Sequence, residues 1–284
     1  MELTDLGYAG PVAVAAGCGG TGRELAAYLD LAALGAFVTR SITVQARQAP
    51  VSLGRQPPVA ETPSGLVAGL GCPNPGIDSF LALELPWLIQ SGVRVHVSVV
   101  GRSLGEYSEL ARRVGRTPGV AGVEVNLSDP DMTGQGLFDV REPFHAASAV
   151  AAVVRDLPRG LPVLAKLRSD VLRVAEVARA VLEAGASGVV LGNALPAALP
   201  DGRGAGLSGP AVMPLMLRCL ADTASALPDA PIVACGGLRT SADVRTAFDA
   251  GAVAVQIGTA VLHDPTAPAT LTRELTESIP GGPA

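Results

Sequence analysis

Short apolar segments rich in Val, Ile and Ala alternate along the chain with longer segments of helical character. Eight of these segments have the length and the double-sided apolar pattern of buried parallel strands. They lie at Pro11–Gly17, Ala36–Ser41, Val93–Gly101, Gly122–Ser128, Leu161–Leu167, Gly188–Asn193, Pro231–Gly237 and Ala252–Gly258. Helices are predicted at Gly22–Leu34, Ile77–Gln90, Leu104–Thr117, Pro143–Asp156, Val171–Ala184, Pro210–Ala226, Ser241–Ala250 and Ala267–Ser278.

Repeated strand-then-helix units favour an α/β fold of the closed (β/α)8 type, the TIM barrel, as a single domain over residues 1–284. An open, doubly wound sheet is the alternative. Against the open sheet, the glycines of the first turn, Ala16–Gly22, do not follow the usual G-x-G-x-x-G register, and no convincing acidic residue closes the second strand.

One connection is too long for an ordinary loop. Residues Ile42–Gly76 separate the second strand from the next helix, and they contain several prolines. Connections of this length are commonly lids or binding loops, and this one leaves the strand end at which barrel active sites lie. We therefore expect a lid or insert at about residues 42–76.

Strand alternation indicates which polar side chains point into the barrel. Asn126, Lys166 and Asn193 fall near strand C-termini, as does Arg40 on the second strand. Polar groups that converge at the mouth of an apolar barrel make a ligand site. A buried cation such as Lys166 needs an acceptor, which a flavin would provide. His96 is expected one layer deeper, in an interior pair near Glu124.

The last two strands end in glycine-bearing turns. These are Cys235–Leu238 and Ile257–Ala260. Glycine allows close backbone approach, and exposed N–H groups bind phosphate. Because phosphate sites of barrels commonly follow strands seven and eight, the two turns predict a phosphate-binding site.

Composition narrows the classes of function. Apolar residues make up 48% of the chain and charged residues 17%, with a net charge of −5. A chain of this balance builds a large core, and its acidity argues against binding of nucleic acid or of acidic membranes. No apolar run approaches the length of a membrane span, and no signal peptide is recognised. The four cysteines form no C-x-x-C pair, so a reduced, cytoplasmic protein is expected.

Two residue types are scarce. Among 21 basic residues Lys166 is the single lysine, and asparagine occurs only at positions 74, 126 and 193. All four positions fall at the predicted mouth of the barrel or in the long connection. Their placement marks them as candidate site residues.

Several segments together resemble the dihydroorotate dehydrogenases, which are FMN-dependent (β/α)8 enzymes of pyrimidine synthesis. The resemblance runs from about Pro11 to Pro265 and fits the soluble branch, because no N-terminal helical extension is present. The segments that carry it are Gly35–Thr43, Glu61–Gly65, Asn74–Gly76, Glu124–Ser128, Gly206–Ala211, Gly236–Gly237 and Val255–Ala260.

The resemblance implies non-covalently bound FMN and assigns roles to residues. Lys166 would face the flavin N1/O2 side and act in catalysis by stabilising negative charge on the reduced ring. The implied cofactor-binding set is Ala16, Gly17, Arg40, Ser41, Asn126, Lys166, Gly209, Gly236, Gly237, Gly258 and Thr259, and the implied substrate-binding set is Arg40, Asn74, Asn126, Asp131 and Asn193. No metal site is expected, since no histidine is placed to assist Asp129 and Asp131.

The chain departs from the family where the base is held. In the soluble family a Ser-Cys-Pro-Asn loop follows the fourth strand, and its cysteine takes the C5 proton while hydride leaves C6 for flavin N5. Here the loop reads Ser128-Asp129-Pro130-Asp131, so Asp129 stands in the place of the base. An ordinary Asp is a weaker base than Cys by about 4–5 pKa units, or roughly 6 kcal/mol of proton affinity. Asp129 would therefore need a desolvated setting, which raises a carboxyl pKa.

These observations predict an FMN-dependent oxidoreductase acting on CH–CH bonds. It would transfer hydride between FMN N5 and a dihydropyrimidine-like or other cyclic amide or carbonyl substrate. Three alternatives stay open: an authentic dihydroorotate dehydrogenase with Asp129 as base, a catalytically silent FMN-binding subunit in which Asp129 is a solvated loop residue, and a phosphate-binding barrel without flavin. Cys72 in the long connection is a further candidate acid or base.

The sequence leaves the electron acceptor open among fumarate, oxygen, and NAD reached through an iron–sulfur flavoprotein partner. Any cluster would belong to the partner, because this chain carries no cluster-binding cysteine motif. The resemblance implies a homodimer.

Overall fold

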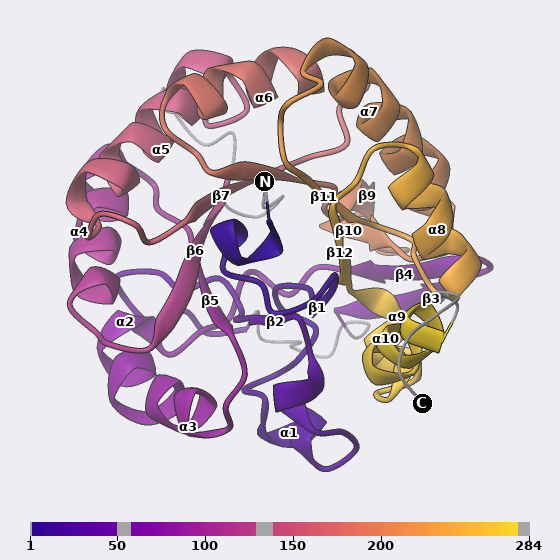
Figure 1. The fold of residues 1–284 in the computed structure, drawn as a ribbon, viewed down its shortest axis with the longest axis horizontal. Helices are drawn as coiled ribbons and strands as arrows, with labels where there is room; N and C mark the ends of the chain where they lie inside the picture. Colours follow the sequence, from indigo (N-terminus) through magenta and orange to yellow (C-terminus); the bar gives the residue numbers. More distant parts are fainter. Residues whose placement is uncertain (1, 50–57, 129–138, 278–284) are drawn as a thin grey trace.

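Eight parallel strands close into a barrel in the computed structural model, which describes residues 2–49, 58–128 and 139–277. The strand order around the barrel is β1-β12-β11-β8-β7-β6-β5-β2 (Figure 1). The strands are β1 (Val12–Val14), β2 (Ala36–Val38), β5 (Val95–Val99), β6 (Val120–Asn126), β7 (Val163–Leu167), β8 (Gly188–Leu191), β11 (Ile232–Cys235) and β12 (Ala254–Ile257). Each overlaps one of the eight segments predicted from the sequence, and the predicted (β/α)8 barrel is confirmed.

Helices surround the barrel, and the regular ones agree closely with the sequence pattern. They are α1 (Arg23–Ala26), α2 (Gly76–Ser79), α3 (Leu85–Gln90), α4 (Leu104–Gly115), α5 (Pro143–Asp156), α6 (Val174–Glu183), α7 (Met213–Ala226), α8 (Ser241–Asp249), α9 (Thr259–His263) and α10 (Ala267–Glu277). Short 3-10 helices cover Leu3–Leu6, Leu31–Ala33 and Pro210–Val212. Among the described residues, no helix is both long enough and apolar enough to cross a membrane.

Two predicted helices are interrupted. The helix expected over Gly22–Leu34 ends after four residues, and Asp30 then caps a separate 3-10 turn by accepting a hydrogen bond from the Ala32 N–H. The helix expected over Ile77–Gln90 widens into a π-helix at Phe80–Glu84. Pro86 follows directly and has no N–H to donate to the preceding turn, which accounts for the change in register there.

The two faces of the barrel strands differ in side-chain size. The outward face is made of branched residues such as Val95, Val97 and Ile232, which pack against the helices. The inward face carries small apolar side chains such as Ala13 and Ala36, which belong to a separate cluster, together with buried polar side chains such as His96 and Lys166. Because a barrel interior must be filled, small inward side chains require material from elsewhere in the chain.

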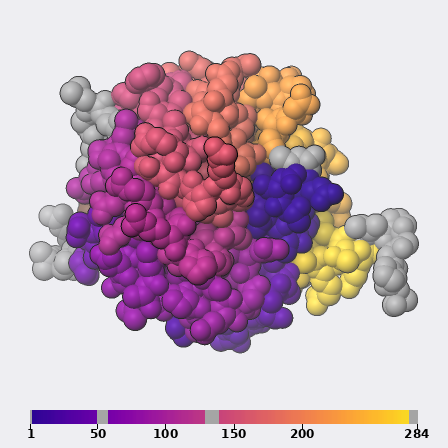
Figure 2. All heavy atoms as spheres, turned by 60° about the vertical axis from the view of Figure 1, so that its left-hand side comes forward, coloured from indigo at the N-terminus to yellow at the C-terminus, as the bar shows by residue number. Residues whose placement is uncertain are grey.

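The N-terminal segment supplies that material. Leu6 and Tyr8 are buried and belong to the inward cluster, and Leu6 contacts the backbone at Gly188 on β8. The 3-10 helix Leu3–Leu6 thereby covers the N-terminal end of the barrel (Figure 1). In the space-filling view of Figure 2, this indigo segment lies directly against the middle of the chain.

A second sheet stands beside the barrel and includes part of the long connection. Residues 42–76 contain a hairpin, β3 (Val59–Thr62) and β4 (Gly65–Ala68). It joins a second hairpin, β9 (Leu195–Ala198) and β10 (Gly204–Ser208), in an antiparallel sheet of order β3-β4-β10-β9 (Figure 1). The sequence pattern did not reveal β9 and β10, since Pro196 and two glycines, Gly204 and Gly206, weaken their strand pattern.

Gly65 lets the two hairpins meet. Its φ is +143°, and a Cβ atom at this position would clash with the carbonyl oxygen of Ser208. Only glycine fits where the backbone of β10 passes this closely.

His96 on β5 is fully buried near the N-terminal end of the barrel. Its Nε2 lies 3.3 Å from the carbonyl oxygen of Gly7, so Nε2 carries the proton, and Tyr8 stacks edge-on with a centroid distance of 4.9 Å. Nδ1 has no hydrogen-bond partner among the described residues. The expected interior pair with Glu124 is therefore wrong, because Gly7 occupies the partner position. Burial lowers the pKa of His96 to about 4.

This buried histidine predicts acid sensitivity. Its folded pKa lies below the unfolded value, so the unfolded chain binds more protons between about pH 6.5 and pH 4, and stability falls as the pH falls through this window. A shift of this size corresponds to about 3 kcal/mol of unfolding free energy. We expect His96→Gln to remove that part of the pH dependence in urea unfolding. The exposed control His263→Gln should leave the wild-type slope, and an unchanged slope in His96→Gln would contradict the assignment.

Candidate active site

A cavity of about 900 Å³ opens at the C-terminal end of the barrel strands. Its floor includes Lys166 and Cys235, and the second sheet forms one wall through Thr62, Ser64 and Ser208. Since this is the end at which barrel enzymes bind ligands, the position alone marks the cavity as the candidate site.

The side chain of Lys166 on β7 lies inside the barrel and is surrounded by polar partners. Its side chain is 2% exposed, and its Nζ donates to Oε1 of Gln256 on β12 at 2.8 Å. Oε1 of Glu124 on β6 lies 3.4 Å from Nζ and has no hydrogen-bond partner among the described residues. The lysine was expected to need an acceptor on a bound ligand, but the barrel itself supplies its acceptors.

Gln256 connects this pair to the N-terminal segment. Its Nε2 donates to Oε2 of Glu124 at 2.7 Å and to the hydroxyl oxygen of Tyr8 at 3.1 Å. Burial, together with the charge of Glu124, raises the pKa of Tyr8 above its ordinary value, so the hydroxyl stays neutral. Tyr8, Glu124, Gln256 and Lys166 form one buried network that crosses the barrel interior.

The charges around Lys166 fix its protonation state. Burial alone would lower the pKa of Lys166, but Cys235 and Glu124 beside it hold the pKa above the ordinary value. Burial raises the pKa of the Cys235 thiol, and burial also raises the pKa of the Cys18 thiol to about 11. At neutral pH the cavity floor therefore presents an ammonium group and two uncharged thiols.

A chain of hydrogen bonds crosses the mouth of the barrel beside the lysine. Ser98 and Ser41 share a hydrogen bond of 2.9 Å, and Asn126 Nδ2 donates to the Ser41 hydroxyl at 2.9 Å. The Ser128 hydroxyl donates to Asn126 Oδ1 at 3.2 Å and accepts from Asn193 Nδ2 at 2.8 Å. This polar belt places Asn126 and Asn193 on either side of β7.

Asn74 has a different position from the other two asparagines. It is 5% exposed, and its Oδ1 accepts from the backbone N–H groups of Thr43 and Gly76 at 3.2 and 3.0 Å. Its Nδ2 donates to the Thr43 hydroxyl and the Cys72 carbonyl, both at 3.0 Å. Asn74 thus ties the two ends of the 42–76 segment together.

Arg40 and Cys72 do not lie in the cavity wall. Arg40 is half-buried, its Nε has no partner among the described residues, and its positive charge helps lower the pKa of Glu24, where hydrogen bonds from Thr21 overcome partial burial. Cys72 adopts a φ of +55° and directs its thiol to the carbonyl of Ser41 at 3.5 Å.

Two turns that contain glycine lie next to each other in the cavity lining. Gly236 and Gly237 follow β11, Gly258 and Thr259 follow β12, and the two strands are hydrogen-bonded neighbours. No hydrogen bond among the described residues uses the backbone N–H of any of these four residues. Four available donors on adjacent turns make an anion-binding cradle.

The predicted site residues divide into three groups. Nine line the cavity: Ala16, Gly17, Lys166, Asn193, Gly209, Gly236, Gly237, Gly258 and Thr259. Arg40, Ser41, Asn74 and Asn126 lie outside its lining, in the contacts described above. Asp129 and Asp131 lie outside the described residues.

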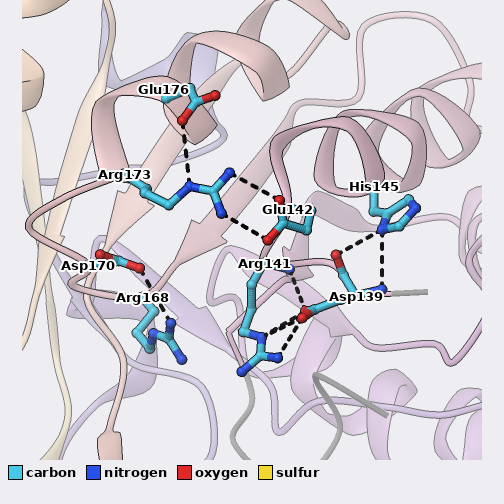
Figure 3. A network of polar contacts seen from close by, with 8 residues as sticks. All are labelled: Asp139, Arg141, Glu142, His145, Arg168, Asp170, Arg173 and Glu176. Carbon is cyan, nitrogen blue, oxygen red and sulfur yellow. Dashed lines mark hydrogen bonds and ion pairs between the residues drawn. The ribbon is translucent and has the colours of Figure 1, made fainter. Parts of the chain in front are cut away.

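An ion-pair network fixes the chain where it enters α5. Arg141 donates to both oxygens of Asp139 at 2.7 and 2.9 Å, and Arg173 pairs with Glu142 at 2.8 Å across to the β7–α6 connection (Figure 3). The Arg141 hydrogen bond lowers the pKa of Asp139, but such exposed pairs contribute little to stability. The Arg173–Glu142 pair joins the start of α5 to the segment that follows Lys166.

Sequence reasoning missed the partners of the lysine. Gln256 was noticed only within the segment that resembles the family, and Tyr8 was not considered. The available signal was a single polar residue on the inward face of the otherwise apolar strand β12, since Ala254 on the same face lies in the inward cluster. Such a residue needs a buried partner.

The comparisons with known proteins agree with this geometry. The family model for dihydroorotate dehydrogenase matches residues 1–279. The chain belongs to the dihydroorotate dehydrogenase family. This confirms the resemblance seen in the sequence, and with it the expectation of an oxidoreductase like those enzymes.

Similar proteins within the family are catalytic subunits of dihydroorotate dehydrogenase B (NAD(+)). The protein from Anoxybacillus flavithermus is 38% identical over 93% of this chain and 86% of its own length. The one from Geotalea uraniireducens is 36% identical over 95% of this chain and 90% of its own. A crystal structure of the Eimeria tenella dihydroorotate dehydrogenase in complex with ferulenol has a TM-score of 0.77 at 20% identity, and covers 94% of this chain and 80% of that one.

The contacts of Asn74 predict a structural contribution. Asn74→Ala leaves two buried backbone N–H groups without an acceptor, at a cost of about 2–4 kcal/mol of unfolding free energy. Asn74→Asp keeps the accepting oxygen and should retain more of the stability. Urea unfolding of the two variants tests this, and an alanine variant as stable as the wild type would contradict it.

Proposed function

We propose that this protein is an FMN-dependent oxidoreductase that transfers hydride between FMN and a C–C bond of a small dihydropyrimidine-like ring or a related cyclic amide or carbonyl compound. One observation carries the proposal: a buried, charged lysine and four backbone N–H donors on two adjacent turns, unpaired among the described residues, line the same cavity. A flavin mononucleotide has the matching chemistry, with an electron-rich pyrimidine edge at one end and a phosphate at the other. When bound, FMN supplies the hydride-accepting or hydride-donating centre.

The cavity residues have distinct tasks in this proposal. Lys166 would hold a positive charge beside the flavin pyrimidine edge, where negative charge develops on reduction. The N–H groups of Gly236, Gly237, Gly258 and Thr259 would hold the phosphate, with Gly209 nearby. Ala16 and Gly17 leave space for a flat ring, because neither has a side chain beyond Cβ.

The substrate also loses a proton when hydride leaves it, and a group other than Lys166 must accept that proton. Lys166 is already protonated, and the thiols of Cys18 and Cys235 have raised pKa values, so none of the three is a ready base at neutral pH. This supports Asp129 as the base, which is the position of the family's catalytic cysteine. Asn193 and the polar belt would orient polar atoms of the substrate ring.

A second reading is an authentic dihydroorotate dehydrogenase. The identity of 36–38% to dihydroorotate dehydrogenase B catalytic subunits favours it. The altered base and the second carboxylate, Asp131, favour a relative with a different ring, because two carboxylates would repel the carboxylate of orotate. The names of the relatives support an electron-transfer partner subunit that uses NAD, and the family resemblance supports a homodimer.

The phosphate cradle makes a specific prediction. The wild-type protein should bind FMN at least a hundredfold more tightly than riboflavin, because hydrogen bonds to a charged group contribute about 1.5–3 kcal/mol each. A Cβ at Gly258 would meet Ala15 and Cys18 at 3.6 Å, an ordinary van der Waals contact, so Gly258→Ala adds a methyl group to the cradle without a steric clash.

We expect Gly258→Ala to reduce the FMN-to-riboflavin affinity ratio at least tenfold in flavin-fluorescence titrations. Gly10→Ala, whose Cβ would also have 3.6 Å of clearance but lies outside the cavity, is the matched control. An unchanged ratio in Gly258→Ala would place the phosphate elsewhere.

The reaction is tested with the FMN-loaded protein under anaerobic conditions. Dihydroorotate, other dihydropyrimidines and lactams are mixed with it, and loss of flavin absorbance is followed by stopped flow. At least one compound should bleach the flavin, and Asp129→Asn should slow that bleaching about 10²–10⁴-fold, the usual contribution of a general base. Fast bleaching by dihydroorotate identifies the second reading, whereas no bleaching by any compound supports a silent FMN-binding subunit.

A further inference from the structure

The charged groups around Gln256 fix the orientation of its side-chain amide. If the Gln256 amide were turned over, its N–H2 group would face the ammonium of Lys166 and its oxygen would face the carboxylate of Glu124. Both contacts would be repulsive, so the observed orientation, with three hydrogen bonds of 2.7–3.1 Å, is the one the neighbours permit. The amide oxygen of Gln256 therefore accepts a hydrogen bond from Lys166, and its amide nitrogen donates one to the carboxylate of Glu124. Gln256 thus bridges the two charged groups.

Glu124 is the carboxylate that faces this lysine from within the barrel. In the part of the chain that the structure describes, the titratable neighbours of Lys166 are Glu124 on β6, Cys235 on β11 and Cys18 in the turn after β1, with Tyr8 behind Gln256. The thiols and the phenol are neutral at neutral pH, as their raised pKa values show. Among the described residues, compensation of the ammonium charge at neutral pH consequently rests on Glu124, which has 0% exposure and lies 3.4 Å from Nζ, and Cys235 adds to it only when its thiol ionises.

We propose that Glu124, with Gln256 as its bridge, is a positioning residue that keeps Lys166 protonated and directed at the cavity whether or not a ligand is bound. The cavity would then offer a constant positive charge to the edge of the bound ring. The identity of that ring as a flavin rests on the proposed function, but the charge state of Lys166 does not.

The single lysine of this chain makes the claim directly measurable. When the protein is produced with lysine carrying 13C at Cε, the one side-chain signal belongs to Lys166, and its chemical shift reports protonation. In the FMN-free wild type we expect the signal of a charged lysine throughout pH 6–10. A signal that titrates within this range, or that is already neutral, would overturn the proposal without the use of any variant.

Variants then separate charge from packing. Glu124→Gln keeps the shape of the side chain and removes its charge, so burial should dominate and lower the proton affinity of Lys166 at least a hundredfold, bringing its titration below pH 10. Tyr8→Phe disturbs the same network but keeps the carboxylate, and Glu124→Asp keeps the charge. In both controls the lysine should stay charged across the range. If Lys166 remains charged in Glu124→Gln, Glu124 has only a packing role.

The FMN-loaded protein gives an independent second readout, because a bound ligand stabilises the folded state of a weakened variant. The pH dependence of the flavin midpoint potential gives the number of protons taken up per two electrons. In the wild type Lys166 should contribute none, whereas in Glu124→Gln, above the midpoint of its lysine titration, one additional proton should be taken up. An equal proton count in the two proteins would overturn the proposal. If FMN does not bind at all, the proposed function fails, and the NMR result still decides the role of Glu124.

Discussion

The burial of one positive charge in the interior of the barrel constrains much of this structure. An unpaired ammonium in such an interior would be strongly unfavourable, and removing one partner of a buried ion pair typically costs about 3–5 kcal/mol. Lys166 is tolerated because β6 and β12, two strands that are not adjacent in the barrel, bring Glu124 and Gln256 to it. Tyr8 in turn completes the hydrogen bonds of Gln256. The N-terminal segment thus fills the barrel interior through Leu6 and completes the buried hydrogen-bond network through Tyr8.

The apolar pattern carries most of the fold information in the sequence. Strands that are buried on both faces appear as uninterrupted runs of Val, Ile and Ala, and all eight barrel strands were found from this signal. Helix α5 begins and ends as predicted, since Pro143 suits a first turn and Leu157 continues in an extended conformation. Barrel closure was inferred from the eight strand-then-helix units, because strands covered on both faces occur in open doubly wound sheets as well.

The site could be predicted only in part. The rarity of lysine and asparagine, together with the alternation of side chains along the strands, correctly placed Lys166 and Asn193 in the cavity lining. The glycine-containing turns indicated the anion-binding cradle. The same reasoning did not show that Asn74 holds together the 42–76 segment, since an asparagine side chain serves backbone groups and ligands equally well. Nor did it show the orientation of Arg40, because a long flexible side chain follows the charges of its neighbours rather than the direction of its strand. The hairpin β9–β10 was missed because its stability comes from pairing with β4, a contact between distant parts of the chain.

The antiparallel sheet beside the barrel has an evolutionary consequence. One of its hairpins comes from the connection after the second barrel strand and the other from the connection after β8, and the two join at Gly65 and Ser208. Since both contribute to one wall of the cavity, a change in length or twist of either hairpin must be matched by the other. Relatives that adapt to bulkier or smaller substrates would therefore diverge by paired substitutions in two remote stretches of the gene, and a graft of one stretch alone would leave an ill-fitting wall.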